Sequence, residues 1–278
     1  MHNFSKFPSL SLLCPRVTAH LRLWSVIVLL AFTGSCAQLP PSKSSLSGKR
    51  LLVTLRFRSP INPNYHYFFL INNAGDQNAP GPVPVLTAPY GNGFATGSGG
   101  AQPGFTDFVR FDNLQPQGYA LYHVVGDPNR SNFVFEGQPV TSIAPDSSDP
   151  RTANQLQFEV DLSQITVDSN GQPLLNSQQT NQLATSIRFL QVNIMATDII
   201  PRDVTTTVNK QLDSLGDSRS LLGATSFLIL DATQIGRVYN NAAFTGQSIS
   251  EPDTLDVYNG NDPTLDLIDW SIEVRQVK

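Results

Sequence analysis

The sequence contains few charged residues and almost no cysteine. Charged residues make up 14% of its 278 residues, whereas a soluble domain usually carries about 25%. A helical bundle or coiled coil needs Glu, Lys, Arg, Ala and Leu in bulk, so this composition argues against one. The two Cys exclude a disulfide scaffold. Disorder is also excluded, because the chain combines low charge with 16 Phe and 7 Tyr that need burial.

The charges that are present divide the chain into two parts. The first 75 residues contain eight Lys or Arg and no acidic residue, whereas the rest contain ten bases and all 22 acids. Such asymmetry is typical of a targeting or interaction segment at one end. Nucleic-acid binding needs clustered Lys and Arg, which the acidic body lacks, so we expect no nucleic-acid partner.

The N-terminal segment has the pattern of an export signal. A run of ten mostly apolar residues, 23–32, follows the basic region. It is too short to span a bilayer, which takes roughly 20 residues, but it has the length of the apolar region of a signal peptide. The small residues Gly34 and Ser35 then lead directly to Cys36. This arrangement resembles the lipobox of bacterial lipoproteins.

The lipoprotein resemblance implies a cleaved signal and a lipid anchor. In that family the chain is cut directly before the Cys, which then carries acyl chains such as palmitate. The signal peptide would cover residues 1–35, and the acyl chains on Cys36 would hold the protein to the membrane. Ala37 stands where an Asp would mark inner-membrane retention in the family. We therefore expect a bacterial cell-envelope protein outside the cytoplasm, with the outer membrane or cell surface favoured.

The body of the chain has the pattern of an all-β domain. Residues 36–48 begin with Cys36 and form a Pro/Ser-rich tether. After it, apolar and polar residues alternate with period two, as in a half-buried strand. Short strands separated by turn residues are typical of a β-sandwich, here of mainly antiparallel strands. Strands are predicted over residues 51–57, 65–71, 105–111, 118–125, 132–135, 155–162, 186–196, 225–230 and 267–274.

One or two short helices complete the prediction, over residues 174–184 and 208–215. In the second, Val208, Leu212 and Leu215 follow helical spacing and Gly216 could end the helix. Residues 49–278 are predicted to form one sandwich, because the last strand is strongly apolar on one face and is expected to share a core with the first. The Pro/Asp/Ser stretch near 144–154 leaves a division into two domains open.

Three segments of the body resemble a known type of sandwich. The segments are YHYFFLINNAGDQNAPGP from Tyr65, QLQFEVDLSQI from Gln155, and SIRFLQVNIMATD from Ser186. Their order is similar to the strand order of DOMON and family-nine carbohydrate-binding domains. Asp76 and Asp198 match acidic positions that follow strands in those domains. The resemblance supports a sandwich and implies glycan binding as one function.

Catalytic motifs are absent from the sequence. It contains no G-x-S-x-G elbow and no HExxH helix. The Gly-rich run 91–97 lacks the strand–turn–helix setting of a dinucleotide site, so it is predicted to be a long mobile loop. After cleavage only His66 and His123 would remain, both within predicted strands, where a packed histidine with a satisfied hydrogen bond is expected. No catalytic residue and no enzymatic activity are predicted.

One segment near the C-terminus is rich in oxygen ligands. Residues 253–266 gather side chains of the kind that Ca²⁺ prefers, although their spacing fits no EF-hand and an ordinary Asx-rich turn has the same composition. Ca²⁺ is the only cofactor that the sequence suggests. The candidate calcium ligands are Asp256, Asn259, Asn261, Asp262 and Asp266.

These observations favour a lipid-anchored envelope protein with a non-catalytic binding or structural role, whose partner is a glycan or another envelope protein. A carbohydrate-binding surface module is the first alternative, because tyrosines could stack on sugar rings. An Asp-dependent hydrolase is the second, because a glycosidase needs two facing carboxylates and the chain has many Asp. The candidate stacking residues are Tyr65, Tyr67, Tyr90, Tyr119 and Tyr122.

The anchor is tested by removing the acylated side chain. In Cys36→Ala no acyl chain can be attached, so the protein should move from the membrane fraction to the soluble fraction of the envelope. Fractionation followed by immunoblotting measures the change. Unchanged partitioning of the variant would refute the lipid anchor.

Overall fold

The computed structural model describes residues 48–100, 104–115, 118–127, 132–168, 172, 174, 176–201 and 208–277. The predicted signal peptide, Cys36 and the tether up to residue 47 lie outside these ranges. The described residues belong to one compact unit. Across them, no helix is long and apolar enough to cross a membrane.

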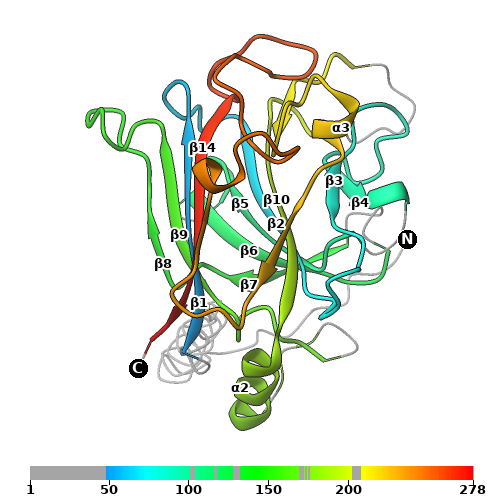
Figure 1. The fold of residues 1–278 in the computed structure, drawn as a ribbon, viewed down its shortest axis with the longest axis vertical. Helices are drawn as coiled ribbons and strands as arrows, with labels where there is room; N and C mark the ends of the chain where they lie inside the picture. Colours follow the sequence, from blue (N-terminus) through cyan, green and yellow to red (C-terminus); the bar gives the residue numbers. More distant parts are fainter. Residues whose placement is uncertain are drawn as a thin grey trace, which may run out of the picture. The chain divides into compact units, whose positions relative to one another are not determined.

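Two antiparallel sheets face each other across a core (Figure 1). The five-stranded sheet contains, in spatial order, β13 (Val238–Asn240), β14 (Leu267–Gln276), β1 (Lys49–Phe57), β9 (Gln155–Asp161) and β8 (Thr141–Ile143). The seven-stranded sheet contains β11 (Leu212–Ser214), β10 (Phe189–Thr197), β2 (His66–Asn72), β5 (Asp107–Phe111), β6 (Tyr119–Val124) and β7 (Phe133–Gly137), with β12 (Leu228–Asp231) also on β10. The predicted all-β sandwich of antiparallel strands is confirmed.

The first and last strands of the body, which are predicted to share a core, also pair with each other in one sheet. β1 lies between β14 and β9, and Leu51 pairs with Val274 on one side and with Val160 on the other. Alternate residues of β1 are buried, because one face of the sheet covers the core while the other meets solvent. The two segments that bound the domain are thereby joined in the middle of one sheet.

The main core is aromatic where the two sheets meet. Phe158 of β9 makes an edge contact with Phe69 of β2, with 5.7 Å between the ring centroids. The same ring lies 5.7 Å from that of Tyr119 on β6. Phe158 and Phe69 are 2% and 1% exposed, so this contact holds one sheet against the other.

β2 is buried on both faces, which explains why its sequence is aromatic without alternation. Phe69 faces the main core, whereas Phe68 faces a second cluster on the outer side of the same sheet. There Phe94 stacks on Phe68, with 4.4 Å between centroids and 5° between the ring planes. The prediction of a long mobile loop over residues 91–97 is therefore wrong at Phe94 and Ala95, which are 3% and 0% exposed.

A small hairpin contributes to this second cluster and packs on the outer side of the seven-stranded sheet. It consists of β3 (Pro82–Pro84) and β4 (Ala95–Gly97), followed by the 3-10 turn η1 (Ser98–Gly100). Gly104 returns close beside it, and a Cβ at this position would lie 2.2 Å from the Cα of Gly97. Glycine in this segment therefore permits close backbone packing instead of conferring mobility.

Only one of the two predicted helices forms where expected. α2 (Ser177–Ser186) begins within the first predicted segment and ends two residues after it. At the start of the helix, the Asn176 side chain accepts hydrogen bonds from the backbone N–H groups of Gln178 and Gln179. The helix predicted at 208–215 is wrong: its end is strand β11, which pairs with the edge of β10. Leu212 and Leu215 are buried as expected, but Leu212 lies in strand β11 and Leu215 in the turn that follows it. The second helix is α3 (Leu221–Ala224), and η4 (Asn241–Phe244) is a 3-10 turn.

The inter-sheet contact is tested at Phe158. Because this ring touches both Phe69 and Tyr119, Phe158→Ala should lower the free energy of unfolding by about 3–5 kcal/mol. The exposed Leu114, at 69% exposure, is a matched control, and Leu114→Ala should change the free energy by less than about 0.5 kcal/mol. Urea unfolding measures both. Equal effects of the two changes would contradict this packing.

Candidate functional site

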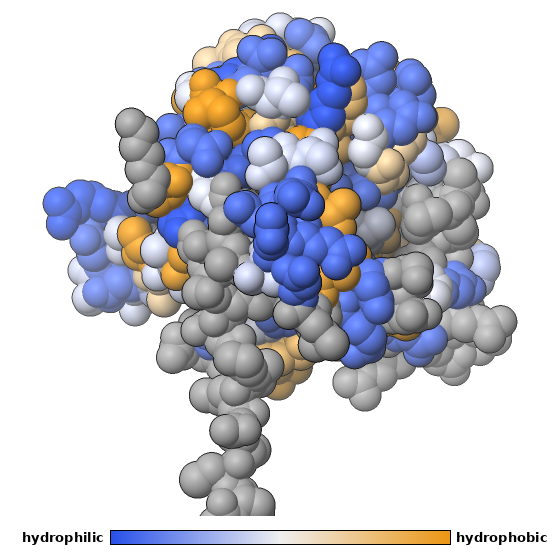
Figure 2. All heavy atoms as spheres, turned by 90° about the horizontal axis from the view of Figure 1, so that it is seen from below, coloured by the Kyte–Doolittle hydropathy of each residue, from blue (hydrophilic) through white to orange (hydrophobic). Residues whose placement is uncertain are grey.

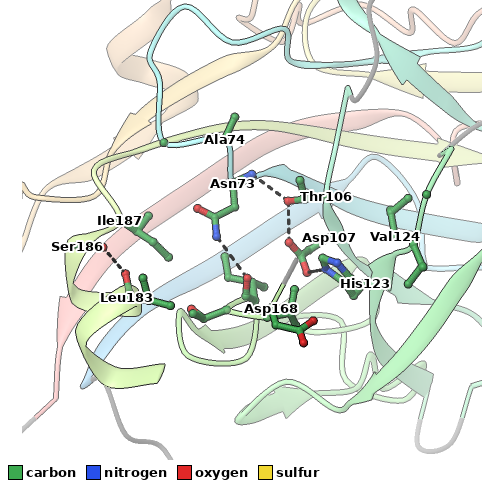
Figure 3. Close-up of a pocket in the computed structure, with 16 residues that line it drawn as sticks. Asn73, Ala74, Thr106, Asp107, His123, Val124, Asp168, Leu183, Ser186 and Ile187 are labelled. Atoms are coloured by element: carbon green, nitrogen blue, oxygen red, sulfur yellow. Dashed lines mark hydrogen bonds and ion pairs between the residues drawn. The ribbon is translucent and has the colours of Figure 1, made fainter. Parts of the chain in front are cut away.

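A pocket of about 670 Å³ opens at the end of the sandwich that carries α2 (Figure 3). It is formed where strands of the seven-stranded sheet end and where the chain turns after β9. Its lining comes from residues 73–75, 106–107, 123–126 and 165–168, and from Leu183, Ser186 and Ile187 around the end of α2. The pocket is therefore supported by rigid elements on several sides.

The wall of the pocket contains a histidine held by a buried carboxylate. Asp107 of β5 and His123 of β6 are directly opposite in the antiparallel register, which brings side chains on one face together. His123 Nδ1 lies 2.8 Å from Asp107 Oδ1, and Thr106 Oγ1 donates to Asp107 Oδ2 at 2.7 Å. Burial raises the pKa of Asp107, although the bonds from His123 and Thr106 oppose that shift. The three side chains are thus fixed in one orientation.

The pocket is acidic and partly apolar. Asp107 and Asp168 bring two carboxyl groups, and the described lining contains no Lys or Arg. Asp168 accepts the N–H of Gln172 at 2.8 Å, so its carboxyl group is held by a turn. Asn73 Nδ2 donates to the carbonyl oxygen of Ile165 at 3.3 Å and ties the end of β2 to the turn after β9. A wall of this kind accepts hydrogen bonds more readily than it donates them.

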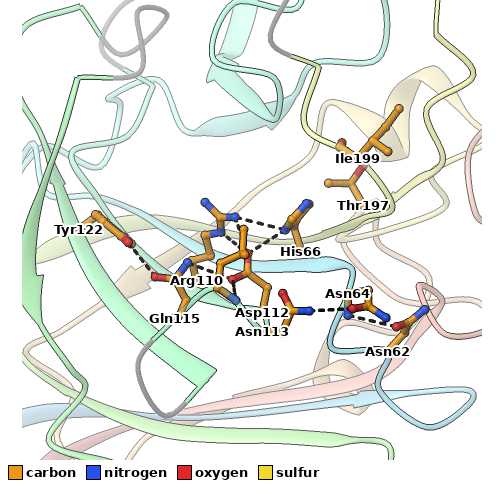
Figure 4. A network of polar contacts seen from close by, with 11 residues as sticks. Asn62, Asn64, His66, Arg110, Asp112, Asn113, Gln115, Tyr122, Thr197 and Ile199 are labelled. Carbon is orange, nitrogen blue, oxygen red and sulfur yellow. Dashed lines mark hydrogen bonds and ion pairs between the residues drawn. The ribbon is translucent and has the colours of Figure 1, made fainter.

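The other predicted strand histidine lies at the opposite end of the seven-stranded sheet (Figure 4). His66 Nδ1 is 2.7 Å from Asp112 Oδ2, and the guanidinium of Arg110 contacts the same oxygen. Asp112 Oδ1 accepts bonds from the backbone N–H of Leu114 and from Gln115 Nε2. Burial acts to raise the pKa of Asp112, but the bonds from His66 and Gln115 and the charge of Arg110 outweigh it and lower the pKa to about 2. Every oxygen of this carboxylate has a partner, so the network is structural.

Three other buried acids come together beside β11. One carboxylate oxygen from each of Asp213, Glu251 and Asp256 lies within 4.8 Å of the other two. Burial is the largest cause that raises the pKa of all three groups, and repulsion from neighbouring acids adds to it. This acidic cluster (Asp213, Glu251 and Asp256) is the one group of side chains in the described residues with the geometry to hold a metal ion.

The five predicted calcium ligands are divided by the fold. Asp256 belongs to the acidic cluster, and Asp266 is beside it, since Asp266 Oδ1 accepts the N–H of Asp256 at 3.1 Å. Asn259 instead donates to Asn209, while Asp262 accepts bonds from Thr264 and Tyr65. Asn261 is exposed. Only the first and last members of the predicted set therefore approach each other.

Sequence reasoning did not find Asp213, Glu251 or the Asp107–His123 pair. Asp213 and Glu251 lie on opposite sides of β12, β13 and η4 in the chain, so no spacing rule connects them. The Asp107–His123 pair depends on the register of β5 against β6. Alternation of apolar residues predicts which face is buried but leaves the partner strand open.

The five tyrosines considered for sugar stacking do not form an exposed platform. Tyr67, Tyr90 and Tyr119 are between 1% and 5% exposed. Tyr122 is half-buried and stacks on Phe108, with 5.1 Å between the centroids. Tyr65 is half-buried, and its hydroxyl donates to Asp262 at 2.9 Å. These rings mainly pack the sandwich.

Because its pKa is lowered, Asp112 contributes to the free energy of unfolding in a way that depends on pH. A carboxyl group with a lowered pKa stabilises the folded state above its ordinary value near 3.8, and this contribution disappears as the pH falls toward 2. Asp112→Asn should therefore lower the free energy of unfolding by roughly 1–2 kcal/mol at pH 6, after allowance for screening near the surface, and by about half as much at pH 3, where the folded-state carboxyl group is still mostly ionised. Urea titrations at both pH values measure this. A difference between wild type and variant that does not change with pH would contradict it, and the exposed Asp253→Asn is the control.

Comparison with known proteins adds no identification: no family model, no curated protein and no solved structure matches the chain. The resemblances to lipoprotein signals and to DOMON and family-nine carbohydrate-binding sandwiches therefore stay predictions from the sequence.

Proposed function

We propose that the chain is a lipid-anchored, non-catalytic binding protein of the bacterial cell envelope, and that its pocket beside α2 binds a small ligand rich in hydrogen-bond donors. The observation that carries this proposal is the pocket of about 670 Å³, which has a fixed Asp107–His123 pair in its wall. Binding sites for small molecules are typically concave, partly apolar and provided with a few convergent polar groups. The pocket combines all three properties.

The charge of the pocket defines the chemical class of the ligand. The partly exposed carboxyl group of Asp168 favours hydroxyl or amino groups, and the buried Asp107, whose oxygens are bonded to His123 and Thr106, acts by orienting His123. Anions are disfavoured, because no Lys or Arg is found in the described lining. Apolar side chains such as Val124, Ile165 and Leu183 cover the remaining wall. A polyol, a sugar or a small amine fits this combination, whereas a dicarboxylate does not.

The place where the body begins supports an arrangement near the membrane. Lys49, the first residue of β1, donates from Nζ to the carbonyl oxygens of Thr185 and Ile187, at 2.8 and 3.1 Å. Ile187 also lines the pocket, so β1 begins at the pocket end of the domain (Figure 1). Twelve tether residues, 37–48, extend to at most about 40 Å. An anchor on Cys36 would thus keep the pocket close to the membrane.

The surface at this end supports a tethered domain that does not insert into the membrane. Figure 2 views the molecule from the α2 end, and hydrophilic residues cover most of its coloured surface. The hydrophobic residues form small, separate patches in this view. Scattered apolar residues of this kind are normal for a hydrated surface.

Glycan binding is a narrower form of the same proposal. Sugars are rich in hydroxyl donors, so the acidic pocket favours them, but the described lining contains no Phe, Tyr or Trp. A sugar in this pocket would be held by hydrogen bonds and aliphatic contacts, without stacking on such a ring. The buried acidic cluster lies near β11, away from the pocket, so it supplies no carboxylate to a ligand held there.

Ligand binding is tested by thermal unfolding of the full chain in detergent against polyols, monosaccharides, disaccharides, small amines and dicarboxylates. At least one ligand with hydroxyl or amino groups should raise the midpoint in a concentration-dependent way, because binding to the folded state stabilises it. Dicarboxylates should have no effect.

Variants assign the effect to the pocket. His123→Ala and Asp168→Asn should each weaken the apparent affinity at least 10-fold, which corresponds to about 1.4 kcal/mol. His66→Ala is the matched control, because His66 lies at the other end of the seven-stranded sheet, and it should leave the affinity unchanged. Binding of anions alone, or equal affinity in all variants, would contradict the proposal.

A further inference from the structure

The acidic cluster joins two segments that are distant in the chain. Asp213 is in β11, whereas Glu251 and Asp256 belong to the long connection between η4 and β14. One oxygen from each of the three carboxylates lies within 4.8 Å of the other two. Exposure of the three residues is only 0%, 6% and 0%, so the carboxylates meet in the interior.

A backbone amide holds one oxygen of each carboxylate. Asp213 Oδ2 accepts the N–H of Leu267 at 2.6 Å, and Asp256 Oδ2 accepts the N–H of Ser218 at 3.0 Å. Glu251 Oε1 accepts the N–H of Gly216 at 3.0 Å. These bonds fix the orientation of all three groups before any ligand binds.

The turn that supplies one of these amides requires glycine. Gly216 has a φ of 84°, a left-handed conformation that side chains rarely adopt. A Cβ at this position would also lie 1.9 Å from the carbonyl oxygen of Ser248. The turn after β11 therefore packs directly against the segment that leads to Glu251.

The second oxygen of each carboxylate has no hydrogen-bond partner. In the described structure, the cluster oxygens without a partner are Asp213 Oδ1, Glu251 Oε2 and Asp256 Oδ1. Buried oxygens of this kind are rare, because a buried polar atom without a partner costs about 1–3 kcal/mol. Three in one cluster, each on a carboxylate that a backbone amide already orients, indicate a ligand that is shared by all of them.

No basic side chain compensates the cluster in the described part of the structure. The ion pairs there include none with Asp213, Glu251 or Asp256. The neighbouring Asp266 differs, because the guanidinium of Arg58 contacts it. Buried carboxylates are either neutralised by protons or paired with a cation. A cation at the centre of the three would both compensate their charge and contact the oxygens that lack partners.

We propose that Asp213, Glu251 and Asp256 bind one hard divalent cation, with Ca²⁺ as the preferred ion. All three ligands are carboxylate oxygens, the type that Ca²⁺ and Mg²⁺ select. The three oxygens lie within 4.8 Å of one another, close enough to share one such ion. Three carboxylates in a buried site favour Ca²⁺, because Mg²⁺ usually keeps several waters and binds through only one or two carboxylates.

The cation would link β11 to the segment between η4 and β14. It would join the edge of the seven-stranded sheet to a segment that leads into the five-stranded sheet. Its role is structural, because the cluster is near β11 and the pocket is beside α2. This proposal does not depend on the ligand of the pocket.

Calcium chloride and EDTA test the site on the full chain in detergent. Millimolar Ca²⁺ should raise the thermal midpoint by about 5–10 °C relative to EDTA, and equilibrium dialysis should find one tightly bound Ca²⁺ per chain. Mg²⁺ at the same concentration should give a smaller shift.

Conservative variants separate a cation site from a cluster that is neutralised by protons. Glu251→Gln and Asp256→Asn should fold in EDTA, since each removes one of the like charges, and should bind Ca²⁺ at least 10-fold more weakly. Asp253→Asn changes an exposed acid in the same connection and should keep the full calcium response. An unchanged wild-type midpoint with Ca²⁺, Mg²⁺ and EDTA, or a full response in both cluster variants, would overturn the proposal.

Discussion

The structure depends on one interaction, the packing of β1, β9 and β14 against the central strands of the other sheet. β1 is the first strand of the body and β14 the last, and both lie beside each other in the five-stranded sheet. Their inward residues meet Phe69 and its neighbours on β2 across the main core. Because the two ends of the domain are joined in this way, the loops at both ends of the sandwich start from fixed positions.

The buried carboxylates of the sandwich differ in how many of their oxygens have hydrogen-bond or ion-pair partners. At the pocket end, Asp107 shares its oxygens between His123 and Thr106. At the other end of the seven-stranded sheet, Asp112 is surrounded by His66, Arg110 and backbone or amide donors. The acidic cluster alone among these groups leaves three oxygens without partners. Since Asp107 and Asp112 have partners for both of their oxygens, the cluster is the place among these three sites where an additional component is needed.

The sequence predicts the larger strands because each carries its own pattern. Alternation identifies β1, β9 and β14, and the aromatic residues of β2 indicate a strand that is covered on both faces. The three-residue strands β3, β4, β8, β11 and β13 are too short to show a period. At 208–215 helical spacing is misleading, because pairing with the edge of β10 outweighs a weak local preference.

The sites are harder to predict because they arise from contacts between distant segments. Asp256 is found from the sequence since it lies in an oxygen-rich stretch, but its partner Asp213 is in strand β11, and Glu251 precedes that stretch in the same connection. Likewise, His123 is recognisable as a strand histidine, whereas its position beside Asp107 depends on strand register. Local composition therefore indicates single ligands but cannot assemble the set.

Hydrogen exchange followed by mass spectrometry, with and without Ca²⁺, tests most directly the claim that uncompensated carboxylates create a cation site. Because the backbone amides of Gly216, Ser218 and Leu267 hold the cluster, slower exchange is predicted in residues 212–218 and 249–258 and at the start of β14. Exchange at the pocket, in residues 73–75 and 123–126, should stay the same. Identical exchange of all segments in Ca²⁺ and in EDTA would contradict the account.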